Sequence, residues 1–145
     1  ARSLSALKAS AMLDVMAVNA VGPALILQLL PQLLAPQGRV AVLSARVGSI
    51  GDNTIGGWHS YRASKAALNQ IVHGAAIELA RTHKGSVCVA LHPGTVATPF
   101  TANYAGRHKT VTPEVAATNL WRVIHGLAPA QTGGFYDYAG EVILW

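Results

Sequence analysis

Two short valine-rich runs, separated by one long helix-forming stretch, constrain the fold of this chain more than any other feature. The runs lie at residues 39–43 and 86–91, and an alanine-rich stretch from about Ser60 to Thr82 lies between them. Short apolar runs of this kind are typical of parallel strands that are buried on both faces. The pattern therefore predicts a strand, a helix and a second strand that belong to one parallel sheet.

The remaining segments continue this alternation of helix and strand. A long helix is expected from about Ser10 to Leu34, with a bend at the Gly22-Pro23 step. Thr112 followed by Pro113 predicts the capped start of a helix that reaches about Gly126. The aromatic and β-branched residues 135–145 suit a last strand and its tail. The sequence thus predicts an α/β fold with a doubly wound parallel sheet, in one domain without repeats or linkers.

Composition indicates the class of protein and the ligands to exclude. The content of 51% hydrophobic and 12% charged residues favours an α/β enzyme interior over a disordered chain. The formal net charge is +5, but the lysines and arginines are scattered and form no basic stripe, so we expect no nucleic-acid partner. The six histidines show no short metal-ligand spacing, so no metal site is expected.

Cysteine usage and hydropathy bear on the compartment. Cys88 alternates with valines in the second run, where a small apolar side chain packs well, so we expect a core position. One cysteine allows no intrachain disulfide, which fits a reducing cytoplasm. Polar residues and prolines interrupt the apolar helix at 10–34, so the sequence predicts a soluble, cytoplasmic protein without a membrane contact.

Tyr61 and Lys65 form the pair that carries chemistry. They are four residues apart near the start of the central helix, so one helical turn places them on the same face. A fixed ammonium beside a phenol favours the phenolate and lowers the pKa of the phenol. We therefore expect Lys65 to lower the pKa of Tyr61 and to make it a usable general acid or base.

The topology predicts where this pair lies. In doubly wound sheets, ligands bind at the carboxyl ends of the strands. Ser44 follows the first valine run, and Pro93-Gly94-Thr95 follows the second. The helix of Tyr61 and Lys65 is fed by the first of these two loops. All of these polar groups are therefore expected to converge on one edge of the sheet.

Four segments together resemble the short-chain dehydrogenase/reductase family. They are VNAVGP at 18–23, the strand and loop RVAVLSARVG, the helix start YRASKAALN, and HPGTVATPF. The stretches GSIGDNTIGGWHSYRASK and GGFYDYAGEVILW are similar to carbonyl reductases of the sniffer and C-factor type. The resemblance implies a Rossmann-like domain of which residues 1–145 are the carboxy-terminal half. The phosphate-binding half of that domain has no counterpart in this sequence.

The resemblance assigns roles to individual residues. Tyr61 would exchange a proton with the substrate oxygen, and Lys65 would lower its pKa and bind the nicotinamide ribose. Asn19 would hold a water in the proton relay to Lys65. A serine would bind the substrate carbonyl, but the matched position is the alanine after Ser44. Ser44 is favoured over Ser49 for this hydroxyl, and both stay open.

Cofactor contacts follow from the same resemblance. The nicotinamide would be framed by five residues of the second loop, Pro93, Gly94, Thr95, Val96 and Thr98. NADP is favoured and NAD stays open, because the residues that separate them lie outside this sequence. Residues from Phe100 to Thr110 lack periodicity and are expected to form a mobile flap over the substrate.

The predicted function is NAD(P)-dependent reduction of an aldehyde or ketone to an alcohol, or the reverse reaction. A sugar-nucleotide epimerase is disfavoured because too few residues follow Lys65 for a substrate domain. The alternative is a non-catalytic, cofactor-binding signalling protein on the same scaffold. The central helix has small or apolar residues on more than one face, which favours a homodimer or homotetramer as much as burial within one subunit. The fragment alone is expected to be inactive.

Overall fold

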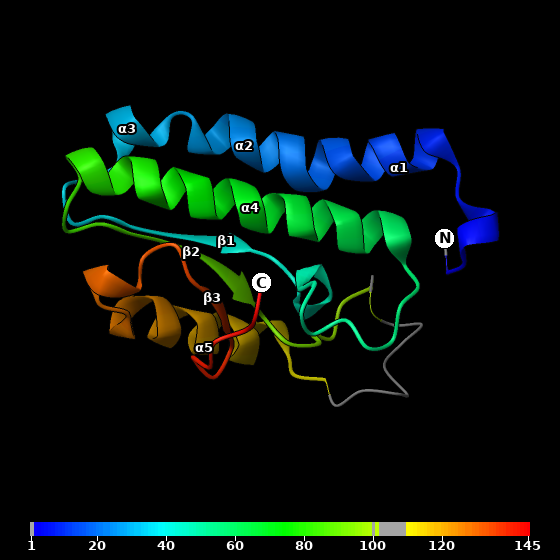
Figure 1. Ribbon diagram of the computed structural model, residues 1–145. Coiled ribbons are helices and arrows are strands. Elements are labelled where there is room, and N and C mark those ends of the chain that lie inside the picture. Colours follow the sequence, from blue (N-terminus) through cyan, green and yellow to red (C-terminus); the bar gives the residue numbers. More distant parts are fainter. Residues whose placement is uncertain (1, 100, 102–109) are drawn as a thin grey trace.

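A computed structural model describes residues 2–99, 101 and 110–145, and it has helices on both faces of a three-stranded sheet (Figure 1). In chain order the elements are α1 (Ala9–Met16), the wider π turn η2 (Ala17–Val21), α2 (Gly22–Leu27), α3 (Leu30–Leu33), β1 (Arg39–Leu43), α4 (His59–Thr82), β2 (Val87–His92), α5 (Pro113–Gly126) and β3 (Phe135–Asp137). Short 3₁₀ turns occur at Leu4–Ala6, Arg46–Gly48 and Pro129–Gln131.

The strands are parallel and lie in the order β1-β2-β3. Arg39 pairs with Val87, and Ala90 pairs with Phe135. The helices from α1 to α4 cover one face of this sheet and α5 covers the other (Figure 1). This arrangement confirms the predicted α/β class with a Rossmann-like parallel sheet.

Two apolar clusters hold the layers together. On one face, Leu68, Val72 and Leu79 of α4 pack with the buried Cys88 and Phe135 of the sheet. On the other face, the cluster joins the sheet to α5 through Val87, Val89, Leu91, Val123, Ile124, Leu127 and Tyr136. Cys88 thus has the core position that was predicted, and burial raises the pKa of its thiol to about 11.

The expectation that both valine runs are buried on both faces is wrong for the first one. β2 is almost wholly buried, whereas β1 alternates between exposed and half-buried residues. The reason is that, among the described residues, β1 pairs with a strand on one side only. Leu43 at its end is 56% exposed, and the sheet edge it belongs to is unpaired within the described chain.

The long amino-terminal helix is less regular than predicted. It widens into the π turn Ala17–Val21 just before Pro23, and the Gly22 amide donates to the carbonyl of Ala17. Proline has no N–H to donate, so the carbonyls before it need other partners. The helix is interrupted again before α3 and ends at Leu33.

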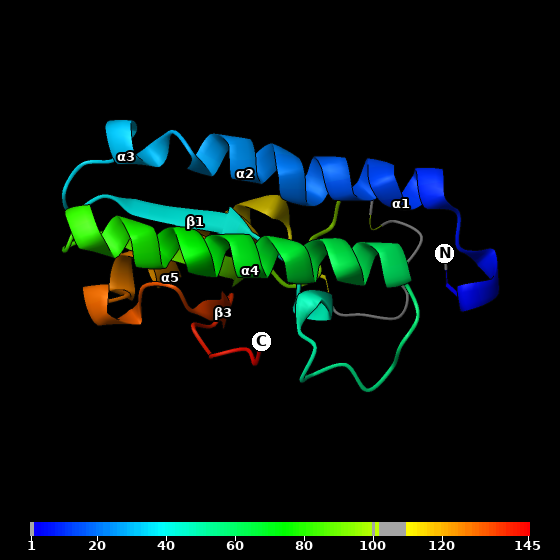
Figure 2. The same cartoon turned by 45° about the horizontal axis from the view of Figure 1, so that its top comes forward.

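The sequence analysis predicted that polar residues and prolines exclude a membrane span in this helix. The structure does not bear out that exclusion. Ala9–Leu27 is 19 residues long with a mean hydropathy of 1.6, which is enough to cross a membrane by length and composition alone. A core helix of a soluble protein passes the same test but is mostly buried, whereas 11% of this window is buried within the described chain. Here α1 and α2 run alongside α4 in both views (Figures 1 and 2), and Leu27 joins the core cluster.

The last segment doubles back after three residues of strand. β3 ends at Asp137, and Gly140 has a φ of +88°, a left-handed value that favours glycine. Oδ1 of Asp137 accepts the amides of Ala139 and Glu141, at 2.9 and 3.1 Å. Val142 then pairs antiparallel with Tyr136.

The other predicted boundaries agree closely with the structure. α4 begins at His59, one residue before the prediction, and ends at Thr82. α5 runs from Pro113 to Gly126, and the hydroxyl of Thr112 accepts the amide of Val115 at 3.4 Å, as expected of a capping residue.

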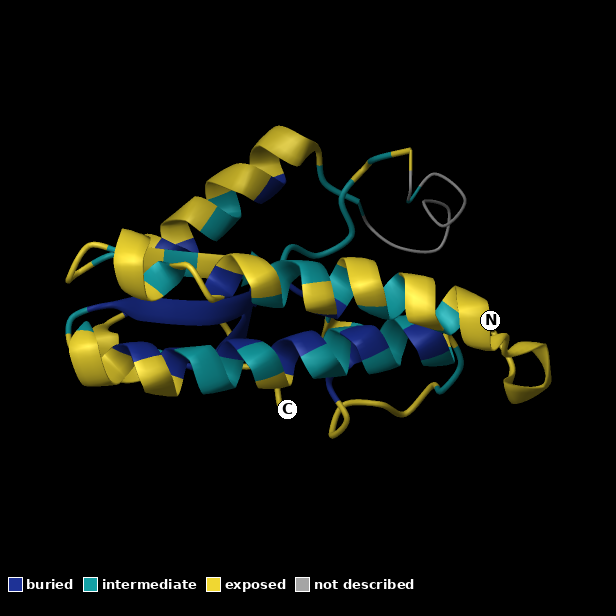
Figure 3. Ribbon diagram, turned by 90° about the horizontal axis from the view of Figure 1, so that it is seen from above, coloured by how far each residue is buried: buried dark blue, intermediate teal, exposed yellow. Residues whose placement is uncertain are grey.

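One close contact fixes the loop after β1 against α4. A β-carbon on Gly48 would lie 2.8 Å from both the carbonyl carbon and the β-carbon of Lys65. Only glycine allows this approach, so the loop sits directly on the helix turn that carries Lys65 (Figure 3 shows the layers from above).

We predict that Gly48→Ala lowers the free energy of unfolding by about 1–3 kcal/mol, because the added methyl overpacks the contact with Lys65. Urea denaturation of the intact protein measures this change. Gly126→Ala is the control, since a β-carbon there meets no atom within 4 Å. Equal stabilities of the two variants would contradict the close packing of the loop.

Candidate functional site

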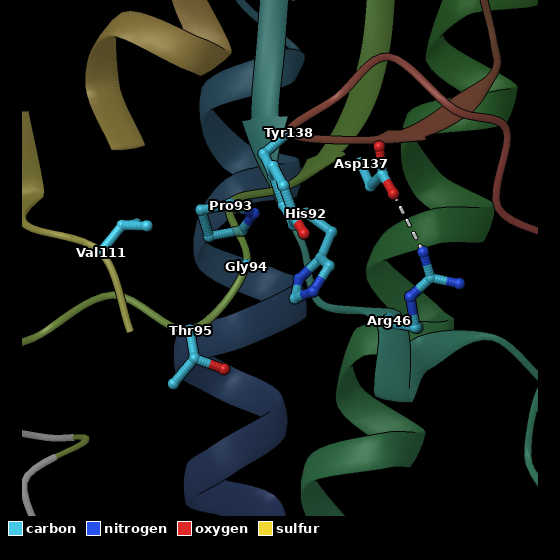
Figure 4. Close-up of a pocket in the computed structure, with 8 residues that line it drawn as sticks. All are labelled: Arg46, His92, Pro93, Gly94, Thr95, Val111, Asp137 and Tyr138. Atoms are coloured by element: carbon cyan, nitrogen blue, oxygen red, sulfur yellow. Dashed lines mark hydrogen bonds and ion pairs between the residues drawn. The ribbon is translucent and has the colours of Figure 1, made fainter. Parts of the chain in front are cut away.

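A cavity of about 560 Å³ opens at the carboxyl ends of β1 and β2. Its lining includes Ser44, Tyr61 and residues 93–96, so these groups converge as predicted, whereas Lys65 lines neither this cavity nor the next one. A second cavity of about 370 Å³ adjoins it and shares five lining residues with it, Arg46, His92, Pro93, Gly94 and Thr95 (Figure 4). Ser49 lines neither of these two cavities.

Tyr61 and Lys65 lie one turn apart at the start of α4, and both are half-buried. The ammonium of Lys65 lies 6.0 Å from the centre of the Tyr61 ring. Its Nζ donates at 3.1 Å to the carbonyl of Leu43, the last residue of β1. This hydrogen bond connects the helix turn of Tyr61 and Lys65 to the end of the strand.

The pKa shifts differ from the sequence-based prediction. Burial raises the pKa of Tyr61 above its ordinary value, and burial lowers the pKa of Lys65 below its own. Lys65 was expected to lower the pKa of Tyr61. Desolvation determines the direction of both pKa shifts, because the removal of each group from water disfavours its charged form.

Asn19 lies in the π turn Ala17–Val21 and reaches the first turns of α4. Its Nδ2 donates to the hydroxyl of Ser64 at 3.1 Å, and that hydroxyl donates to the carbonyl of Tyr61 at 2.8 Å. The predicted relay from Asn19 to Lys65 through a bound water stays a prediction. What the structure shows is a chain of contacts from Asn19 to the backbone of Tyr61.

The two candidate serines have different surroundings. Ser44 is 4% exposed, and its hydroxyl donates to Oδ1 of Asn69 at 2.6 Å. Ser49 is 2% exposed, and its hydroxyl accepts the amide of Asp52 at 3.0 Å. Of the two, only Ser44 lines the cavity that contains Tyr61, and Ala45 lines it too.

The Pro93-Gly94 turn brings the backbone close to the cavity. Gly94 has a φ of +77°, and a β-carbon there would lie 2.9 Å from the Tyr138 ring. Two backbone hydrogen bonds to Val111 fix the chain that follows Gly94. The Ala97 amide donates to the Val111 carbonyl at 2.8 Å, and the Val111 amide donates to the Thr95 carbonyl at 3.1 Å.

Thr98 bonds Thr101 through its amide at 3.0 Å and its hydroxyl at 3.2 Å. The five residues predicted to frame the nicotinamide all line the larger cavity. The predicted flap at Phe100–Thr110 lies, apart from Thr101 and Thr110, outside the described residues.

The sequence reasoning missed three side chains at the cavity. Arg46 bridges two carboxylates. Its Nη1 lies 3.2 Å from Asp52, and its Nη2 lies 3.1 Å from Asp137, the pair that Figure 4 shows. His92 lies between the cavities, and burial together with the charge of Arg46 lowers its pKa to about 4. Asp137 is 91 positions from Arg46, so no local pattern could have paired them.

Comparison with known proteins identifies the family. Residues 1–127 match the family model described as enoyl-(acyl carrier protein) reductase. A 1-hydroxy-2-glutathionyl-2-methyl-3-butene dehydrogenase of a Rhodococcus species is 38% identical over 128 residues, which are 88% of this chain and 56% of that protein. The C-signal protein of Myxococcus xanthus is 39% identical over 132 residues, which are 88% of this chain and 75% of that protein.

Solved structures show the same relationship. The carbonyl reductase Sniffer of Drosophila melanogaster aligns with a TM-score of 0.88 at 28% identity, over 99% of this chain and 60% of that one. An NADPH-bound carbonyl reductase from chicken fatty liver aligns with a TM-score of 0.83 at 29% identity, with the same coverage of both chains. The chain thus spans little more than half the length of several of its relatives. It belongs to the short-chain dehydrogenase/reductase family, and its structure is of the carbonyl reductase type.

Proposed function

We propose that the protein containing this chain reduces an aldehyde or ketone to an alcohol with NADPH, or catalyses the reverse reaction. The observation that carries the proposal is the position of Tyr61. Its side chain lines a cavity at the carboxyl ends of two parallel strands, with Lys65 one helical turn away. A phenol that can give up and regain a proton beside a bound carbonyl is a general acid and base for this reaction.

The described residues fit the nicotinamide end of such a cofactor. The cavity offers backbone groups at residues 93–96, where Gly94 permits close approach, and the hydroxyl of Thr98. Hydroxyls and backbone amides are the groups that bind a neutral carboxamide and a ribose. NADP is the cofactor we propose, supported by the NADPH-bound neighbour.

The proposed mechanism uses four side chains of the chain. When bound, the reduced nicotinamide supplies the hydride to the carbonyl carbon. Tyr61 donates its proton to the carbonyl oxygen, and Lys65 stabilises the phenolate that remains. Ser44 donates a hydrogen bond to the same oxygen after its hydroxyl turns away from Asn69. Asn19 fixes the first turns of α4 through Ser64, and it would hold a water that returns a proton toward Lys65.

We also propose that residues 1–145 are part of a single Rossmann-type domain that is active only when whole. The phosphate-binding half expected of such a domain has no counterpart among these residues, so residues 1–145 alone would not turn over substrate. The cytoplasm is the proposed compartment, since a single cysteine suits a reducing environment.

A homodimer or homotetramer is the proposed assembly. Several large apolar side chains on α1, η2 and α2 are exposed, and a second subunit could cover them. They are Leu13, Val18, Val21, Leu25 and Ile26.

A second function is favoured by one relative and one residue. The Myxococcus xanthus relative is named C-signal, and Ala45 stands where a family serine was expected. A cofactor-binding signalling protein would keep the nicotinamide site and lose the chemistry. Cofactor binding without turnover of any aldehyde or ketone is the result that would select this alternative.

The Tyr61→Phe variant tests the proposed reaction. We predict that it lowers kcat for NADPH-dependent aldehyde reduction by at least about 100-fold, because the proton donor is lost. NADPH oxidation by the intact protein measures the rate, and fluorescence titration measures cofactor affinity, which is expected to change little. Tyr136→Phe is the control, since its hydroxyl bonds Gln131 away from both cavities. Full activity of Tyr61→Phe would refute the mechanism.

The pH dependence follows from the raised pKa of Tyr61. Reduction needs the protonated phenol, so its rate is expected to stay level up to about pH 9 and to fall only beyond the ordinary phenol pKa of about 10. Oxidation of the alcohol needs the phenolate, so its rate is expected to rise with pH as the phenolate forms. Steady-state rates in both directions between pH 6 and 10.5 measure this. A reduction rate that already falls near pH 7 would show that Lys65 has lowered the pKa instead.

Paired alanine variants distinguish the two serines. Ser44→Ala is expected to lower kcat by about tenfold or more, because a hydrogen bond to the developing oxyanion is lost. Ser49→Ala removes an equally buried hydroxyl outside the cavity and is expected to affect stability more than kcat. Turnover and urea unfolding of both variants give the comparison. The reverse order would assign the hydroxyl to Ser49.

A further inference from the structure

Arg46 is the cation, among the described residues, that lines both cavities. Arg62 lines the larger cavity only, and its Nε and Nη1 donate to backbone carbonyls of the surrounding loop, those of Val47, Gly56 and Gly57, which hold it against that loop. The guanidinium of Arg46 has five N–H donors, and its two ion pairs are the hydrogen bonds its side chain makes with described residues. Arg46 therefore has donors left for a ligand.

The two carboxylates that contact Arg46 are held very differently. The side chain of Asp137 is 11% exposed, and its other oxygen accepts two backbone amides. It fixes one side of the guanidinium. The side chain of Asp52 is 42% exposed and lies on a loop, so its single contact with Arg46 is weak and exchangeable.

His92 lines the same wall as Arg46, and its pKa responds to the charges there. The charge of Arg46 lowers the pKa of His92 more than the charge of Asp137 raises it. His92 is itself neutral near pH 7, since its pKa is about 4. Arg46 is thus the positively charged side chain on the wall that the two cavities share.

We propose that Arg46 determines substrate specificity by binding an anionic group, a carboxylate, at the end of the substrate remote from the reacting carbonyl. This inference rests on the proposed function. The carbonyl lies against Tyr61 in the larger cavity, and the carboxylate displaces Asp52 from Arg46 and is bound by the guanidinium fork. Asp137 positions Arg46 from behind.

Two aldehydes that differ in charge and by one methyl group test the proposal. They are 4-formylbenzoate and its methyl ester, offered to the intact protein with NADPH. We expect Arg46→Gln to lower kcat/KM for the carboxylate by about tenfold or more beyond any effect on the ester, because a charged hydrogen-bond pair is lost. Arg46→Lys, which keeps the charge but not the fork, is expected to be intermediate. Asp52→Asn is expected to shift the preference further toward the carboxylate.

The control is Arg122→Gln, which removes the same charge from the exposed face of α5, where Arg122 bonds Asn119. It is expected to leave the ratio of the two substrates unchanged. An unchanged ratio of kcat/KM for the two aldehydes in Arg46→Gln would overturn the proposal, whether both values fall equally or neither falls. Equal losses would leave Arg46 a structural role.

Calorimetric titration separates this proposal from the reductase proposal. If the intact protein binds 4-formylbenzoate more tightly than the ester in an Arg46-dependent way but reduces neither, the anion site stands and the reductase function fails. If it reduces both with no Arg46-dependent preference, the reductase function stands and the anion site fails.

Discussion

The packing of the loop after β1 on the first turns of α4 is the contact on which the site depends. Gly48 allows the loop to touch the backbone of Lys65, and the Lys65 ammonium bonds the carbonyl of Leu43. Asn19 reaches the same turns through Ser64. The strand end, the loop and the long amino-terminal helix thus all position one helical turn. Because that turn carries Tyr61, a small shift of any of the three would move the Tyr61 phenol relative to the Pro93-Gly94 turn.

Much of this arrangement could be predicted from the sequence. The valine runs defined β1 to the residue and β2 within one, and Thr112-Pro113 defined the start of α5. These patterns are local, so a single sequence contains them. The convergence of Ser44, Tyr61 and residues 93–96 followed from the topology of parallel sheets, in which strand ends share one edge.

The rest depends on distances in space that no local pattern contains. The direction of the Tyr61 pKa shift depends on how far burial outweighs a cation 6.0 Å from its ring. Arg46 and Asp137 meet only because β3 lies beside β2 and the chain turns back after it. The exposure of β1 depends on which strands pair with it, and the valine pattern alone could not show that one side is unpaired within the described residues.

The most direct test of the central claim is a crystal structure of the intact protein with NADP⁺. We predict that the nicotinamide occupies the cavity of about 560 Å³, between the Tyr61 hydroxyl and the backbone of residues 93–96, with the Lys65 ammonium at the ribose. A dinucleotide bound elsewhere, or a nicotinamide out of reach of Tyr61, would contradict the assignment of this cavity as the active site.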